Sequence, residues 1–215
     1  MGKVFAEISM SLDGYVAGPY PSLEKPLGEG GDQLHEWAFR LKSFREPHGL
    51  PGGETGPDDE LIAESLRATG AVVMGRRMFS GGEGPWDDDV NAEGWWGDEP
   101  PFHIPVFVLT QHVREPLTMK GGTTFTFVTE GVESAVEDAR AAAAEKDVSI
   151  AGGANAIDQC INAGLVDELQ IHLAPVLLGD GARLFDGVGP KLPGFELTGV
   201  LESPLVTHLR YRILK

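Results

Sequence analysis

The sequence has almost no cysteine and no long apolar run. Cys160 is the single cysteine among 215 residues, so no disulfide can form within the chain. It falls on the apolar face of an expected helix with no base arranged beside it, which favours a small buried hydrophobic residue over a nucleophile. No stretch approaches the roughly 20 apolar residues of a membrane-spanning helix. The N-terminal MGKVFAEISM also lacks the pattern of a secretory signal, so we expect a soluble, cytoplasmic protein.

Basic residues are scarce as well. The chain has 17 Lys and Arg against 33 Asp and Glu, a formal net charge of −16. This excess of negative charge argues against nucleic acid or an anionic membrane surface as the main partner. Any phosphate group must therefore be held by local donors against the overall field. Hydrophobic residues make up 41% of the chain, as is usual in globular proteins, and its length most simply forms one domain over residues 1–215.

The stretch from Val148 to Leu178 organises the rest of the chain. Its pattern predicts a short buried strand over 148–151, a glycine pair at Gly152–Gly153, a helix over 154–163 and a second strand over 168–177. The order strand, glycine pair, helix allows a ligand to come close to the backbone.

The start of that helix is a candidate anion site. The N–H groups of Ala154, Asn155 and Ala156 are expected to be unpaired donors at the positive end of the helix, which suits a phosphate. A tight strand-to-helix turn also uses glycine for packing alone, so this stretch by itself leaves both interpretations open. Because GGANAI lacks the third glycine of G-x-G-x-x-G, a nucleotide would bind here in a different α/β architecture.

A second candidate anion site follows the apolar run 71–74. Gly75, Arg76 and Arg77 come directly after this expected central strand. Ligands of open α/β sheets bind at the carboxyl ends of the strands, and guanidinium groups can grip a phosphate with two hydrogen bonds. The alternative is that both arginines are solvated surface charges.

The remaining pattern completes the expected fold. A helix over 32–45 begins with Asp32 as its N-cap, and Thr55 to Asp58 resembles a capping box for a helix that ends at Gly70 and turns Leu66 inward. In the last strand, His208 falls on the side opposite Leu209, which predicts a half-exposed strand. The further expected elements are strands at 4–10, 15–17, 106–110, 123–128, 195–202 and 206–214 and a helix at 132–146. This order predicts an open, mixed, mostly parallel sheet with helices on both faces and antiparallel C-terminal strands.

The segment 83–105 has no period and carries Trp86, Trp95 and Trp96. These side chains either pack on the surface as an insertion or form a wall of a pocket, and the sequence leaves both open. The aspartates 87–89 are expected to form a solvated turn, and no metal site is expected.

Several motifs together resemble one family. The segments ISMSLDGYVAG, AVVMGRRMF, VFVLT, VSIAGGANAI and AGLVDELQIHLAPVLLGDGARLF follow one another in the order typical of the dihydrofolate reductase-like fold. They are most similar to the C-terminal reductase domain of the bifunctional riboflavin-biosynthesis deaminase–reductase and its stand-alone relatives. The resemblance covers nearly the whole chain, apart from long loops at 18–31 and 83–105.

This resemblance implies NADPH binding. In the family the Gly-Arg after the central strand contacts cofactor phosphates, the end of the VLT strand lies near the adenosine, and the glycine pair commonly carries a cis peptide, with the following helix N-terminus at the pyrophosphate. The corresponding residues of this chain are Gly75, Arg76, Arg77, Thr110, Gln111, His112, Gly152, Gly153, Ala154, Asn155 and Ala156.

The resemblance also implies a substrate side. Ser11, Leu12, Asp13 and Gly14 match the segment between nicotinamide and substrate, with Asp13 the best candidate for a proton donor. Trp37 and Phe79 would face the substrate pocket. Dihydrofolate reductase has a carboxylate on its first helix a few residues before a Trp, whereas this chain has Leu34 three residues before its Trp.

We therefore expect an NADPH-dependent reductase that acts on a small pyrimidine, pterin, carbonyl or imine, similar to 5-amino-6-(5-phosphoribosylamino)uracil reductase of riboflavin biosynthesis. The alternatives are a dihydrofolate or pterin reductase and a nucleotide-binding protein without catalysis. Relatives tend to dimerise through the sheet, so a homodimer is expected.

Overall fold

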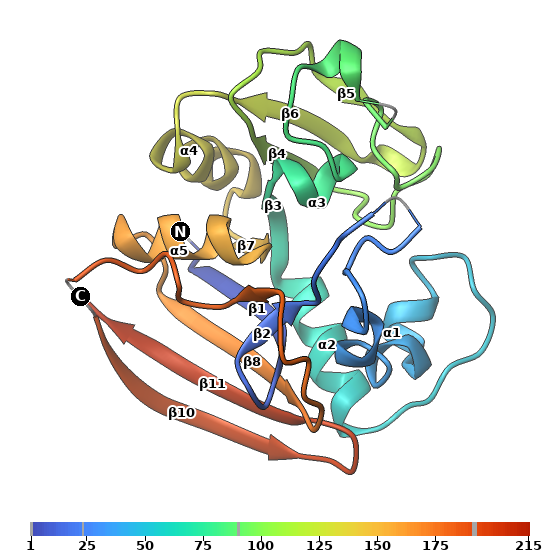
Figure 1. The fold of residues 1–215 in the computed structure, drawn as a ribbon, viewed down its shortest axis with the longest axis vertical. Helices are drawn as coiled ribbons and strands as arrows, with labels where there is room; N and C mark the ends of the chain where they lie inside the picture. Colours follow the sequence, from blue (N-terminus) through green and yellow to red (C-terminus); the bar gives the residue numbers. More distant parts are fainter. Residues whose placement is uncertain (1, 23, 90, 191–192) are drawn as a thin grey trace.

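The computed structural model describes residues 2–22, 24–89, 91–190 and 193–215 (Figure 1). Within them, a nine-stranded sheet has the order β10-β11-β8-β1-β7-β3-β4-β6-β5. The strands are β1 (Val4–Ser11), β3 (Thr69–Gly75), β4 (Pro105–Leu109), β5 (Leu117–Thr118), β6 (Thr124–Val128), β7 (Asp147–Gly152), β8 (Glu168–Ala174), β10 (Gly194–Glu202) and β11 (Thr207–Leu214). A separate pair joins β2 (Tyr15–Ala17) to β9 (Ala182–Arg183).

The strand directions confirm the expected mixed sheet. The strands β8, β1, β7, β3, β4 and β6 run parallel, and β10, β11 and the short β5 pair antiparallel with their neighbours. The parallel strands are the short apolar runs of the sequence, because both of their faces are covered.

Helices cover both faces of the sheet (Figure 1). The helices are α1 (Lys42–Arg45), α2 (Pro57–Ala68), α3 (Arg76–Ser80), α4 (Val132–Ala143) and α5 (Ala154–Asn162). Helices α4 and α5 bury their apolar faces on the larger core, which includes Val73, Ile150 and Cys160. Cys160 is fully buried, and its burial raises the pKa of the thiol to about 12, so it is an inert core residue, as expected. No helix among the described residues is long and apolar enough to cross a membrane.

The helix expected over 32–45 is wrong. The chain instead forms two 3₁₀ turns, η1 (Gly31–Leu34) and η2 (Ala38–Arg40), before the short α1. Leu41 takes an extended conformation (φ −71°, ψ 144°) and forms a bridge with Glu54. This pairing with a distant segment interrupts the helical run, and Gly30, rather than Asp32, is the N-cap of the first turn.

Helix α2 also differs from expectation. Its N-cap is Gly56 with no side-chain hydrogen bond, so the capping box at Thr55 is not formed; Pro57 and acidic residues occupy the first turn instead. Leu66, expected inside, is half exposed, whereas Asp59 is buried and accepts a hydrogen bond from the backbone N–H of Ser43. The inner side of α2 is therefore polar, which bears on the buried side chains that it covers.

Candidate functional site

The two stretches that the sequence marks as anion sites lie in contact at the carboxyl edge of the sheet. Strand β3 lies between β7 and β4, with Met74 paired to Gly152 and Gly75 paired to Leu109. A Cβ built on Gly75 would lie 3.8 Å from the Cβ of Ala156 and 3.8 Å from the carbonyl oxygen of Gly152. The absence of a side chain at position 75 thus lets the two stretches pack against each other.

The N-terminus of α5 follows directly on the glycine pair at the end of β7. The Gly152–Gly153 peptide is cis, as the resemblance implies, and Gly153 is an N-cap without a side-chain hydrogen bond. Ala156 donates its N–H to the carbonyl of Gly153 (3.1 Å), so it is not the free donor that we expected. Among the described residues, the N–H groups of Ala154 and Asn155 have no acceptor, which leaves these two for an anion.

The two arginines after β3 differ sharply. Arg76 is buried: its guanidinium pairs with Asp89 and Ser80 and stacks on Trp86, 3.5 Å from the ring centroid. The expectation that Arg76 offers a free guanidinium to a phosphate is therefore wrong, because Asp89 already neutralises it. Arg77 is exposed and pairs only with the exposed Glu83, so it is able to turn toward a ligand.

A hollow of about 600 Å³ lies beside the end of β4, and Gln111 and His112 are part of its lining. Thr110 holds this turn, since its hydroxyl accepts a hydrogen bond from the N–H of His112 (3.1 Å). Trp86 forms another wall, and its indole N–H donates to the carbonyl of His112 (2.8 Å). Trp86 is thus a wall of a pocket, the second of the two interpretations that the sequence left open.

Arg114 is a residue of this hollow that the sequence analysis missed. Its guanidinium lies 4.8 Å from the centroid of Trp86, on which Arg76 also stacks. One of its terminal nitrogens, Nη1, is buried with no hydrogen-bond partner in the described structure. The signal was the one applied to Arg76, an arginine shortly after the end of a buried strand.

The loop after β1 is ordered by Asp13. The carboxylate accepts hydrogen bonds from the hydroxyl of Ser11 (2.6 Å) and from the backbone N–H groups of Leu178 (3.2 Å) and Gly179 (2.8 Å). The bond from Ser11 and those from the backbone lower the pKa of Asp13 to about 2. A group with such a pKa is ionised at neutral pH, which favours the loop-ordering role of Asp13 over that of a proton donor.

The rest of this loop combines one exposed apolar side chain with a buried neighbour. Leu12 is 58% exposed, whereas Ser11 is fully buried and also accepts the N–H of Tyr15. Gly14 has φ +87°, a conformation that favours glycine. The apolar side chain of Leu12 is thus exposed, while the buried, hydrogen-bonded Ser11 fixes the backbone beside it.

We expect Asp13→Asn to loosen this loop without removing a catalytic proton. Because the pKa is depressed in the folded state, the carboxylate stabilises the fold above about pH 4 and loses this effect as the pH falls toward 2. Thermal unfolding should therefore show a lower midpoint for the variant at pH 7 and no difference near pH 2. A difference that persists at pH 2 would contradict this role.

Phe79 and Trp37 are both buried. Phe79 is fully buried, with its ring 4.9 Å from Phe125 and 5.2 Å from Phe127, so it is a core residue and the expectation that it faces substrate is wrong. Trp37 lies between η1 and η2 rather than on a long helix, and its indole N–H donates to Leu34 (3.0 Å) and Ser9 (3.3 Å).

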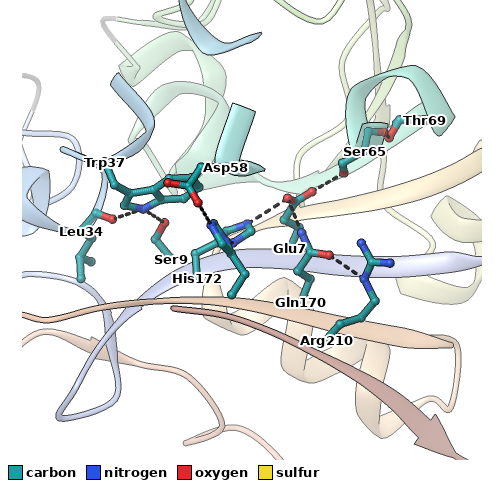
Figure 2. A network of polar contacts seen from close by, with 11 residues as sticks. Glu7, Ser9, Leu34, Trp37, Asp58, Ser65, Thr69, Gln170, His172 and Arg210 are labelled. Atoms are coloured by element: carbon teal, nitrogen blue, oxygen red, sulfur yellow. Dashed lines mark hydrogen bonds and ion pairs between the residues drawn. The ribbon is translucent and has the colours of Figure 1, made fainter. Parts of the chain in front are cut away.

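Trp37 borders a buried polar network that the sequence analysis missed (Figure 2). The network lies between α2 and the sheet and is built from Glu7 and Ser9 on β1, Gln170 and His172 on β8, His208 on β11, and Asp58 and Ser65 on α2. His208 is 2% exposed, so the prediction that it faces water is wrong, because α2 covers it; Arg212, further along the same side of β11, is exposed as predicted. The signal was present as polar residues at every second position of two apolar strands.

Among the residues that the structure describes, no cluster of three His, Cys, Asp or Glu could hold a metal ion. The site is therefore built from backbone donors, arginines and an aromatic wall at three adjacent strand ends. Together with the mixed sheet, this arrangement is that of an α/β protein with the dihydrofolate reductase-like fold.

Comparison with known proteins gives the family. The model of the RibD C-terminal domain matches residues 2–209, so the chain belongs to that family. It is a family of NADPH-dependent reductases of the aminouracil reductase type, which makes this chain an oxidoreductase.

Individual relatives are distant. A putative riboflavin biosynthesis protein from Shewanella sp. PV-4 superposes with a TM-score of 0.63 at 21% identity, covering 100% of both chains. Dihydrofolate reductase from Enterococcus faecalis, complexed with NADP(H) and RAB-propyl, superposes with a TM-score of 0.53 at 14% identity, covering 100% of this chain and 98% of that one. The uncharacterized protein YyaP of Bacillus subtilis is 45% identical over 47 residues, which span 22% of this chain and 25% of that protein.

Proposed function

We propose that the protein transfers a hydride from NADPH to a small pyrimidine, pterin, carbonyl or imine substrate, as 5-amino-6-(5-phosphoribosylamino)uracil reductase does. The observation that carries this proposal is the close approach of Gly75 to Gly152 and Ala156, which brings the two candidate anion sites together at the carboxyl edge of the sheet. Membership of the RibD C-terminal domain family supports it.

The hydrogen-bond donors at the carboxyl ends of β7, β3 and β4 fit the parts of NADPH. Ala154 and Asn155 offer free N–H groups at a helix N-terminus for the pyrophosphate. Arg114, with its unpartnered nitrogen, and the exposed Arg77 suit the adenosine phosphate beside the hollow. Leu12 on the neighbouring strand end suits the nicotinamide, which supplies the hydride when the cofactor is bound. The protein's part is then to position the reactants and exclude water.

The segment before Trp37 bears on the alternatives. Leu34 is buried there, and the nearby acids Asp32 and Glu36 are exposed, so this segment presents no buried carboxylate to a pterin ring. This favours the aminouracil-type substrate over folate. It also leaves a nucleotide-binding protein without catalysis as the second candidate.

Calorimetry with NADPH and with NADH, followed by NADPH oxidation in the presence of a panel of aminopyrimidines, dihydropterins and small carbonyl compounds, tests the proposal. We expect NADPH binding and turnover with one class of substrate. Binding without turnover would support the second candidate. No heat with either cofactor would overturn both.

We expect Arg114→Gln to weaken NADPH binding about 10- to 100-fold, since a hydrogen bond to a charged group contributes about 1.5–3 kcal/mol. NADH lacks the phosphate on the adenosine ribose and should bind equally well to the variant and the wild type. Arg77→Gln should have a smaller effect of the same kind, and the exposed Arg67→Gln on α2 is the matched control. Equal weakening of NADPH and NADH binding would show that Arg114 does not bind the adenosine phosphate.

The homodimer stays a prediction. The outer strand β10 supports it, because Phe195, Leu197 and Val200 are exposed on this sheet edge. An edge strand that exposes apolar side chains is suited to pairing with another chain.

A further inference from the structure

Two histidines, His172 and His208, meet in the buried network beneath α2, and Figure 2 shows His172 within it. His172 on β8 and His208 on β11 are directly paired in the antiparallel register and are 3% and 2% exposed. Their Nδ1 atoms lie 2.6 Å apart. The opposite nitrogens each face a carboxylate: Nε2 of His172 lies 2.9 Å from Glu7, and Nε2 of His208 lies 3.1 Å from Asp58.

Counting protons fixes the charge of the pair. A carboxylate only accepts hydrogen bonds, so both Nε2 atoms must carry a proton. The contact between the two Nδ1 atoms needs one proton, because two lone pairs or two N–H groups would repel each other at this distance. Three protons on four ring nitrogens correspond to one imidazolium and one neutral imidazole, a single positive charge on the pair.

The carboxylate of Glu7 fits this count. Burial alone would raise the pKa of Glu7, but the hydrogen bonds from His172 and Ser65 and the positive charge beside it keep that pKa below its usual value. Gln170 donates to the same carboxylate (3.0 Å). A group that accepts from three donors is ionised, so its partner His172 must donate.

Two other basic groups, His35 and Arg210, lie near the pair. Burial lowers the pKa of His208, as does the charge on His172, so a second proton on the pair is disfavoured. Burial and the same charge lower the pKa of His35, the C-cap residue of η1, to about 4, so His35 is neutral near pH 7. Arg210 on β11 donates to Gln170 (3.0 Å).

The pair contacts three other parts of the fold. Through Glu7 it reaches β1, and through Asp58 it reaches the first turn of α2. Trp37 packs on both imidazoles, with ring centroids 4.8 Å from His172 and 5.0 Å from His208. We propose that His172 and His208 share one proton at neutral pH, that this proton clamps α2 and Trp37 onto β1, β8 and β11, and that alkaline pH opens the clamp by removing it.

The clamp has a defined dependence on pH. Unfolded histidines titrate near pH 6.5, so above that pH the folded pair holds one proton where the unfolded chain holds none. Below it the folded pair holds one where the unfolded chain holds two. Stability therefore rises with pH up to about 6.5 and falls above it, by up to tenfold in the unfolding equilibrium constant per pH unit. At alkaline pH the shared proton passes to solvent. The hydrogen bond between the two Nδ1 atoms is then lost, because it depends on that proton.

Nitrogen NMR of the histidine rings in the intact protein tests the proton count. We expect three ring protons on the pair at pH 7, with one signal shared between the two Nδ1 atoms. Two ring protons, as in two neutral imidazoles, would overturn the proposal. This measurement needs no variant, and it does not depend on the reductase function, so either proposal can fail without the other.

Denaturant unfolding between pH 5 and 9 tests the clamp itself. We expect the wild type to lose stability above neutral pH, and the double variant His172→Gln/His208→Gln to lack this alkaline decline. His35→Gln is the matched control, since it removes a buried neighbouring histidine and should keep the decline. Hydrogen exchange of α2, corrected for the intrinsic effect of pH, should speed up at least tenfold from pH 7 to 9, while α4 on the other face stays protected. An unchanged α2, or an alkaline decline that survives in the double variant, would refute the clamp.

Discussion

Replacing Arg76 by methionine is expected to lower the free energy of unfolding by about 3–5 kcal/mol, the usual effect of removing one partner of a buried ion pair. The side chains of Arg76 and Asp89 are 7% and 5% exposed, so the remaining aspartate would be buried without a counter-charge. The variant would also lose the stacking of the guanidinium on Trp86. Denaturant unfolding at pH 7 measures the change.

Arg77→Met is the matched control for this prediction. Arg77 is the next residue on the same short helix, but its side chain is 69% exposed and pairs with an exposed Glu83. Surface ion pairs contribute about 0–1 kcal/mol, so this variant should stay nearly as stable as the wild type. The double variant Arg76→Met/Asp89→Asn should recover part of the loss, since neither charge is then left alone. If Arg76→Met instead folds with wild-type stability and only loses NADPH, Arg76 is a cofactor ligand and the ion pair has little structural importance.

Replacing Asn155 by aspartate is expected to weaken NADPH binding about 10- to 100-fold with almost no change in shape. The new charge would stand in the first turn of α5, beside the free N–H groups proposed for the pyrophosphate. Two unit charges about 5 Å apart repel by roughly 1–3 kcal/mol at a protein surface. The same charge favours the helix itself by about 0.3–1 kcal/mol, because it faces the positive end of the helix dipole. Stability and cofactor affinity should thus change in opposite directions.

Gln159→Glu is the control for this second prediction. Gln159 is exposed, donates to the side chain of Asn155 and lies one turn further along the helix. The same change in charge at this greater distance should reduce affinity only slightly. The effect of Asn155→Asp should also shrink as salt is added, since salt screens exposed charges. Equal losses for both variants would show that overall charge, rather than the helix N-terminus, governs binding.

The central strands and the glycine turn could be predicted because their signals are local. The runs 71–74, 106–110 and 148–151 are short and apolar, and Gly152–Gly153 stands between a strand and a helix with a clear apolar face. Each pattern contains the reason for its own structure. The candidate anion site at α5 was inferred from the same signals, although the N–H of Ala156 is bonded to Gly153 and is not free.

The segment between β1 and β3 could not be predicted in the same way. The bridge between Leu41 and Glu54 breaks the expected helix, and no local pattern announces a partner at that separation. Likewise, Arg76 satisfies every rule for a phosphate ligand until Asp89, from a loop without period, folds over it. The polar network, in contrast, did have a local signal. Glu7 and His172 each belong to a regular alternation of polar and apolar residues, which indicates a polar, covered face of the sheet.

Trp86 also limits how ligand specificity can evolve at the hollow that it lines. One side of the indole packs against Phe79 and Phe127 in the interior, and the other part lines the hollow beside Gln111 and His112. Arg76 and Arg114 both stack on it. A substitution of Trp86 would therefore alter both ligand fit and folding. We expect new specificity at the hollow to arise by substitution of Gln111, His112 or Arg114 rather than of the tryptophan.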